Sequence, residues 1–179
     1  MNAIATTQNY GELIEPTTLQ IERLLPGPIE RVWSYITNSE MRSRWLAAGE
    51  MELKVGAEFE FIWRNDTLSR VPAADRPAGF SEEMRMKSRI TELDPPHKIS
   101  FTWVNSGDVT ITLTPKGQGV LLSAVHRRLP DRDTLVMVAS GWHEHLDFLQ
   151  AVVSEKPLPS SFWSGWIELR AEYDRRLPA

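Results

Sequence analysis

The sequence contains no cysteine among its 179 residues. Disulfides, thiolate nucleophiles and cysteine-based zinc sites are therefore excluded, and the absence fits a reducing compartment. Long apolar runs are also missing, since no stretch approaches the roughly 20 residues that cross a bilayer. The first residues, MNAIATTQNYGELIEP, lack the basic and apolar regions of a secretory signal. We therefore predict a cytoplasmic protein that does not contact a membrane.

Positive charge and catalytic signature motifs are scarce as well. The 20 Lys and Arg residues are outnumbered by 24 Asp and Glu, which gives a formal net charge of −4. This balance does not favour binding to nucleic acid. The chain has no Ser/His/Asp spacing, phosphate-binding glycine loop, GxGxxG string or calcium loop. We predict no nucleic-acid partner, no cofactor, no metal and no catalytic residue, so enzyme activity is the less favoured expectation.

Large aromatic residues, by contrast, are abundant, and seven of them are tryptophans. In the string AEFEFIWR, Phe59, Phe61 and Trp63 share one face of an extended chain, while Glu58 and Glu60 share the other. Such a period of two predicts a half-buried β-strand. Large rings on one face indicate either a packed core or the lining of a cavity.

The same periodicities predict the other elements. Residues 1–16 are polar and aperiodic and predict a flexible tail, whereas residues 17–179 predict a single domain. Alternating patterns predict strands, and apolar residues at helical spacing predict helices. We expect strands at 17–25, 57–64, 84–93, 98–105, 109–115 and 120–129, and helices at 28–36, 40–47, about 134–153 and about 161–177.

This order of elements predicts an α+β fold. About six antiparallel strands form a curved sheet around the long helix, and two short helices follow the first strand. The Pro- and Gly-containing segment 65–83 predicts a long loop near the mouth of any cavity between helix and sheet. The apolar stripe of the last helix predicts docking onto the body of the domain, with a homodimer contact as the alternative.

Four strings in this order resemble the START-like, helix-grip (SRPBCC) superfamily, and more closely the bacterial relatives of the C-terminal domain of the activator of heat-shock-protein-90 ATPase. They are ERLLPGPIERVW (22–33), RWL (44–46), GAEFEFIW (56–63) and SGWHEHLDFL (140–149). The resemblance covers roughly residues 17–177 and implies the helix-grip fold with an internal cavity. It does not supply a catalytic motif, because this fold carries many functions.

The string GWHEHLD places two histidines and two carboxylates close together in the sequence. With about 100° per residue in a helix, His143 and His145 lie about 160° apart. Metal ligands on one helix are normally three or four residues apart, so that they share a face. A metal site is therefore not predicted. We expect His143 to point largely to water, and His145 to lie at the edge of the apolar face that Trp142 begins.

The candidate ligand-binding residues are the large and polarisable side chains on the faces predicted to look inward. His145 and His126 are the polar candidates, since either could orient the polar end of a ligand, although a hydrogen-bonded structural role is the simpler interpretation of His145. The other candidates are Trp45, Phe59, Phe61, Trp63, Met86, Phe101, Trp103, Trp142 and Leu149, with Met84 as further adaptable lining.

Three functions remain open from the sequence. The leading expectation is a domain that binds a small apolar or amphipathic ligand in a cavity between the sheet and the long helix. The first alternative is a protein-interaction module similar to the chaperone-activator domain, which would contact a chaperone. The second alternative is a cyclase- or hydrolase-like enzyme that uses His145 or His126 as a general base.

Overall fold

The computed structural model describes residues 9–69, 75–105 and 107–179. It has an α+β fold in which seven antiparallel strands form one curved sheet, in the order β1-β2-β7-β6-β5-β4-β3. The elements are β1 (Glu12–Glu15), β2 (Thr18–Pro26), α1 (Ile29–Thr37), α2 (Ser39–Arg42), β3 (Glu58–Trp63), the 3₁₀ helix η1 (Asn65–Thr67), β4 (Met84–Asp94), β5 (Lys98–Thr102), β6 (Asp108–Lys116), β7 (Gly119–Arg127), α3 (Arg132–Val153) and α4 (Phe162–Arg176).

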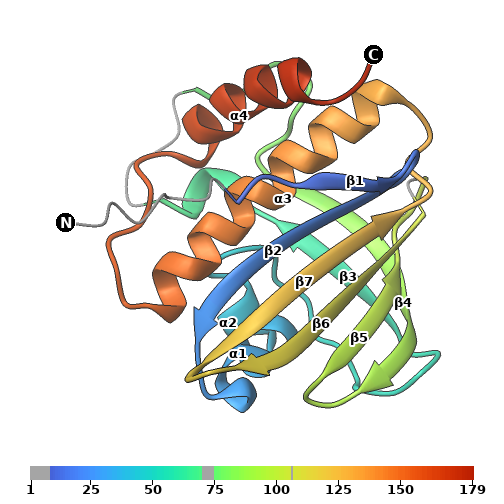
Figure 1. Cartoon of the computed structure of the whole chain (residues 1–179), viewed down its shortest axis with the longest axis vertical. Coiled ribbons are helices and arrows are strands. Elements are labelled where there is room, and N and C mark those ends of the chain that lie inside the picture. Colours follow the sequence, from blue (N-terminus) through green and yellow to red (C-terminus); the bar gives the residue numbers. More distant parts are fainter. Residues whose placement is uncertain (1–8, 70–74, 106) are drawn as a thin grey trace.

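The predicted α+β helix-grip fold is confirmed. Figure 1 shows α3 lying across one face of the sheet, with α4 on the side of α3 that faces away from the strands. Among the described residues, no helix is both long and apolar enough to span a membrane.

The alternation of side chains along the strands determines which face of the sheet meets α3. In β3, Phe59, Phe61 and Trp63 are buried, as predicted from the period of two. On the opposite face Glu58 pairs with the guanidinium group of Arg89 at 2.6 Å. Because alternate residues of a strand point to opposite faces, one side of the sheet forms the core and the other carries ion pairs.

One strand lies where a tail was predicted. Residues Glu12–Glu15 form β1 and pair with β2, so Glu12 lies opposite Gln20. The prediction of a flexible tail over residues 1–16 is therefore wrong for this part, while residues 1–8 lie outside the described residues. The physical reason is that only Leu13 is half-buried in β1, so backbone pairing rather than an alternating apolar face holds this edge strand.

Three of the helices, α2, α3 and α4, begin at a side chain that accepts a hydrogen bond from a free N–H group of the first turn, whereas α1 has no such cap. Pro28 precedes α1, and the side chain of Asn38 accepts a hydrogen bond from the backbone N–H of Met41 at 3.0 Å at the start of α2. Asp131 caps α3 in the same way, by accepting from the N–H of Thr134 at 2.7 Å. Ser161 caps α4 through the N–H of Ser164.

The apolar stripe of α4 packs against the body of the domain. Phe162, Trp166, Tyr173 and Leu177 are buried, and Leu169 is half-buried. The prediction that this stripe docks onto the domain is therefore confirmed. The buried part of the stripe is not available for contact with a second copy of the chain.

Arg42 holds together the turn that follows α2. It is 1% exposed, and its guanidinium group donates to the carbonyl oxygens of Ile36 and Ala47, each at 3.1 Å, and also to those of Thr37 and Gly49. Burial lowers its pKa to about 10, so the group remains charged at neutral pH. Because these charged hydrogen bonds join carbonyl groups before and after α2, Arg42 fixes the path of the chain from α1 toward β3.

Candidate functional site

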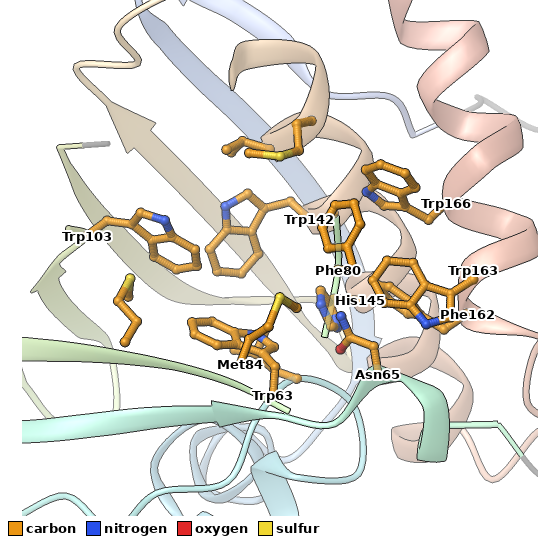
Figure 2. A pocket seen from close by; sticks show the side chains of 15 residues that line it. Trp63, Asn65, Phe80, Met84, Trp103, Trp142, His145, Phe162, Trp163 and Trp166 are labelled. Atoms are coloured by element: carbon orange, nitrogen blue, oxygen red, sulfur yellow. The ribbon is translucent and has the colours of Figure 1, made fainter. Parts of the chain in front are cut away.

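A cavity of about 240 Å³ lies between α3, the α4 N-terminus and the ends of β3 and β4. Seven aromatic side chains line it, and five of the chain's seven tryptophans are among them. Figure 2 shows rings from the strands and from α4 gathered around this space. The seven rings are those of Trp63, Phe80, Trp103, Trp142, Phe162, Trp163 and Trp166.

Five of the eleven predicted ligand-binding residues line this cavity. They come from β3, β4, the residue that follows β5, and α3. These residues are Trp63, Met86, Trp103, Trp142 and His145, and Met84 lines the cavity beside them.

The other six predicted residues do not line the cavity. Phe61 packs edge-to-face on Phe59 and Phe101, with ring centroids 4.9 and 5.3 Å apart, and the three rings fill the core under the sheet. Trp45 is fully buried and donates from Nε1 to the carbonyl oxygen of Tyr35 at 2.8 Å. The six residues outside the lining are Trp45, Phe59, Phe61, Phe101, His126 and Leu149.

Sequence reasoning missed nine residues of the lining. They lie in α3, α4, the turn after α2 and the segment after β3: Leu46, Asn65, Phe80, Met137, Val138, Gly141, Phe162, Trp163 and Trp166. A helical signal existed for two of them, because Val138 and Gly141 precede His145 by seven and four residues and so share its face. Nothing in the local pattern signalled the loop residues Asn65 and Phe80.

His126 supports the cavity from behind one of its walls. It is 1% exposed, and its Nδ1 accepts a hydrogen bond from the indole Nε1 of Trp142 at 3.2 Å. Its ring also lies 5.1 Å from that of Trp103. His126 therefore orients two of the tryptophans that line the cavity and does not itself reach the space between them.

His145 is a polar group in the lining. Its Nδ1 lies 2.7 Å from the carbonyl oxygen of Trp45. Because a carbonyl only accepts, Nδ1 carries the proton and Nε2 keeps its lone pair. Burial lowers the pKa of His145 to about 4, so the ring is neutral at physiological pH.

Asn65 is the second polar side chain in the lining. It begins η1 directly after β3 and is 5% exposed. Its Oδ1 atom is buried, and no described residue donates a hydrogen bond to it. Buried amide oxygens are normally paired, so this atom is an exception that calls for an explanation.

The described ends of the predicted long loop lie beside the cavity, and residues 70–74 lie outside the described part of the chain. Asp66 accepts a hydrogen bond from the indole Nε1 of Trp163 at 2.7 Å. Asp75 accepts from the hydroxyl group of Ser161, and Phe80 lies 4.9 Å from the ring of Trp163. These contacts place the two described ends of the loop against the start of α4, beside the cavity.

His143 is buried, so the prediction that it points largely to water is wrong. The Nδ1 of His143 lies 2.9 Å from the hydroxyl group of Tyr173, which accepts a hydrogen bond from the backbone N–H of Gly11 at 2.7 Å. Its Nε2 lies 3.5 Å from a carboxylate oxygen of Asp147. The helical wheel of α3 alone could not predict this, because Tyr173 of α4 and the chain around Gly11 cover that side of α3.

This buried group joins α3, α4 and the chain that precedes β1. Burial lowers the pKa of His143 to about 4 and raises the pKa of Tyr173 to about 12. Both side chains are therefore neutral at physiological pH, and neither is activated as a base or as a nucleophile. Asp147 also accepts from Arg23 at 2.9 Å, which connects β2 to α3. His143 and His145 thus have different neighbours and different roles.

Glu144 lies in the interface between α3 and α4. It is 4% exposed, and it packs so closely on Gly165 that a Cβ atom there would overlap its carboxyl group. Burial, followed by the negative charges of Asp147 and Glu168, raises the pKa of Glu144 to about 8. The folded protein therefore keeps a proton on Glu144 at neutral pH, whereas the unfolded chain releases it near the ordinary value of 4.5.

We expect Glu144→Gln to stabilise the protein increasingly as the pH rises from about 4.5 to 8. The folded wild type binds one more proton than the unfolded chain in this range, so its stability falls with rising pH, and neutral Gln removes the effect. The gain at pH 8 is expected to be on the order of 2–4 kcal/mol, with little difference at pH 4. Urea denaturation at both pH values measures it, and parallel pH profiles for the two proteins would contradict the expectation.

Comparisons with known proteins agree with this architecture. Residues 26–154 match the family model described as Activator of Hsp90 ATPase homolog 1-like protein. The chain is similar to the solution structure of the protein encoded by gene BPP1335 from Bordetella parapertussis, with 32% identity over 96% of this chain and 92% of that chain and a TM-score of 0.80. A search of curated proteins gives no match.

Two more distant structures share the fold. CalU16 from Micromonospora echinospora is 21% identical over 88% of this chain and 86% of its own, with a TM-score of 0.62. The Q3J4M4_RHOS4 protein from Rhodobacter sphaeroides is 20% identical over 81% of this chain and 97% of its own, also with a TM-score of 0.62. The family match, the Bordetella relative and the fold agree, and the chain belongs to the Activator of Hsp90 ATPase homolog 1-like family, within the START-like helix-grip superfamily.

Proposed function

We propose that this domain binds a small, uncharged and largely apolar molecule in the cavity between α3, the sheet and the start of α4. The observation that carries the proposal is the composition of the lining: of its fifteen described residues, seven are aromatic and none is Asp, Glu, Lys or Arg. Ligand pockets in proteins are mostly apolar with a few polar groups that fix orientation. A charged ligand would lose its hydration here without gaining a counter-charge.

The volume of the cavity and the flexible methionine side chains in its lining further restrict the class of ligand. Its volume of about 240 Å³ lies just below the range of about 300–1,000 Å³ that is typical of ligand pockets, which favours one or two rings over a long chain. Met84, Met86 and Met137 also line the space, and the flexible thioether side chain adapts to the outline of a ligand. Flat aromatic walls favour a planar ligand that stacks on them.

The indole N–H groups of the tryptophans allow ligand binding to be measured. We would titrate naphthalene and related ring compounds into ¹⁵N-labelled protein and follow the seven indole N–H signals by NMR. The signals of the five lining tryptophans are expected to shift with saturation. Trp33 and Trp45 lie outside the lining and serve as internal controls. If ring compounds at their solubility limit move none of the five signals, or move all seven alike, the proposal is wrong.

Binding of a neutral ligand is expected to be independent of pH between about 5.5 and 8. The reason is that burial lowers the pKa of His145 to about 4, so the lining carries no charge in this range. Below pH 4 the imidazole takes up a proton, and a positive charge beside apolar rings weakens binding of an uncharged compound. Titrations at pH 8, 6 and 4 measure this, and a loss of affinity centred near pH 6.5 would contradict it.

A role as a chaperone-contacting module is a second proposal, and the family description favours it. It predicts that the purified protein binds the host chaperone and changes its ATPase rate. The pocket-filling variant described in the Discussion separates the two proposals, because a surface contact would survive the filling of an internal cavity. No enrichment of the chaperone on immobilised protein would count against this second function.

An enzymatic role of the cyclase or hydrolase kind has weaker support. A general base works best with a pKa near the working pH, whereas burial lowers the pKa of His145 to about 4. His126 already accepts a hydrogen bond from Trp142 and lies behind the lining. Neither histidine is therefore poised to take a proton from a substrate.

A further inference from the structure

We infer that the cavity selects compounds carrying a hydroxyl group on a ring, such as phenols, over the corresponding ethers and hydrocarbons. The inference rests on the proposed function and adds a chemical class to it. Its basis is the pair of polar side chains in the lining: the Nδ1 atom of His145 is bonded to Trp45, which leaves Nε2 with a lone pair, and Oδ1 of Asn65 is buried with no hydrogen-bond donor among the described residues.

His145 offers a ligand only a lone pair. Its Nδ1–H is committed to the carbonyl oxygen of Trp45, which fixes the tautomer. The other ring nitrogen, Nε2, is therefore an acceptor, and burial keeps it unprotonated at neutral pH. A ligand atom next to Nε2 must donate a hydrogen bond, since a carbonyl or ether oxygen there would place two lone pairs against each other.

Asn65 is the second polar group of the lining that a ligand can bond to. Its Oδ1 is a buried acceptor without a donor, and its amide NH₂ group is a donor. The side chain cannot easily withdraw, because Asp66, the next residue, is bonded to Trp163 at 2.7 Å and holds η1 against α4. In the view of Figure 2, Asn65 and His145 lie between Trp63 on one side and the rings of α4 on the other.

A hydroxyl group fits this pair better than the alternatives. It donates its single proton to Nε2 of His145 or to Oδ1 of Asn65, and in the first case its oxygen also accepts from the amide N–H of Asn65. An ether or a ketone leaves Nε2 of His145 unpaired, and a hydrocarbon leaves both residues unpaired. A carboxylate is excluded in addition by its charge, because no cationic side chain is among the described residues of the lining.

The test compares three compounds with the same ring system: 2-naphthol, 2-methoxynaphthalene and naphthalene. We expect 2-naphthol to bind at least about ten-fold more tightly than 2-methoxynaphthalene at pH 7, measured through the indole signals. In Asn65→Leu, which keeps the side-chain size but removes both polar groups, the ratio is expected to fall to about three-fold or less.

Each outcome has a defined meaning. Equal affinities of naphthol and its methyl ether for the wild type overturn the inference while leaving the proposed function intact. A ratio that is unchanged in Asn65→Leu overturns it as well, because Asn65 then takes no part in recognition. If none of the three compounds binds, the proposed function itself fails, and the inference fails with it. Asn65→Leu is preferred to a His145 variant because His145 also supports the backbone at Trp45.

Discussion

Replacing Gly141 by phenylalanine is expected to abolish binding of ring compounds while the protein stays folded. Gly141 lines the cavity from α3, and a Cβ atom placed on it meets no described atom within 4 Å beyond its two neighbours in the chain and the nearby backbone of α3 itself. A phenyl ring at this position would extend into a space of only about 240 Å³. We expect affinity to fall by roughly 100-fold or more, because ligand and ring would compete for the same volume. The indole NMR titration measures this directly.

Gly141→Ala is the matched control. A methyl group occupies little of the cavity, so binding should remain, and alanine in a helix is about 1 kcal/mol more favourable than glycine. The alanine variant is therefore expected to melt at a higher temperature and still bind. Undiminished binding by a folded Gly141→Phe protein would place the ligand elsewhere and would contradict the proposed site.

Replacing Arg42 by methionine is expected to lower the free energy of unfolding by at least about 3 kcal/mol. Methionine keeps much of the side-chain volume but removes every hydrogen bond from the guanidinium group to the carbonyl oxygens around it. Each buried carbonyl left without a donor costs about 1–3 kcal/mol. The cation–π contact with Phe61, at 5.4 Å, is lost in the same substitution. Urea denaturation followed by tryptophan fluorescence measures the change.

Arg44→Met controls for the loss of a positive charge in the same turn. Arg44 is exposed and donates to the hydroxyl group of Tyr35 at 3.2 Å, a surface contact worth about 0.5 kcal/mol or less. The loss of unfolding free energy in Arg42→Met should therefore be several-fold larger than the loss in Arg44→Met. Similar urea midpoints for both proteins would mean that the buried hydrogen bonds of Arg42 contribute little.

The sequence predicted the architecture well because burial on one face leaves a periodic pattern. Phe59, Phe61 and Trp63 alternate with exposed residues in β3, and the structure buries all three. The strand β1 left no such pattern, because it lies at the edge of the sheet and is held by backbone hydrogen bonds to β2. Edge strands with one half-buried side chain give propensity-based reasoning little to detect.

The site was predicted less completely because two of its walls depend on long-range contacts. Trp63, Trp103 and Trp142 belong to elements whose inward face is readable from the sequence. Trp163, in contrast, reaches the cavity only because α4 folds back along α3 and the loop residue Asp66 accepts its N–H. The burial of His143 has the same origin, since its partner Tyr173 lies 30 residues further along the chain.

The cavity wall formed by α4 lies outside the residues that match the family model. The region shared with the family ends at residue 154, whereas α4 begins at Phe162. Trp163 and Trp166 therefore shape the cavity from outside the shared region, and the loop that packs on them ends at β4 within it. A change in the last helix alone would therefore reshape this wall of the cavity without altering the residues that match the family model. If the proposed function is correct, exchanging α4 between relatives would change which ligand is bound while the sheet stays the same.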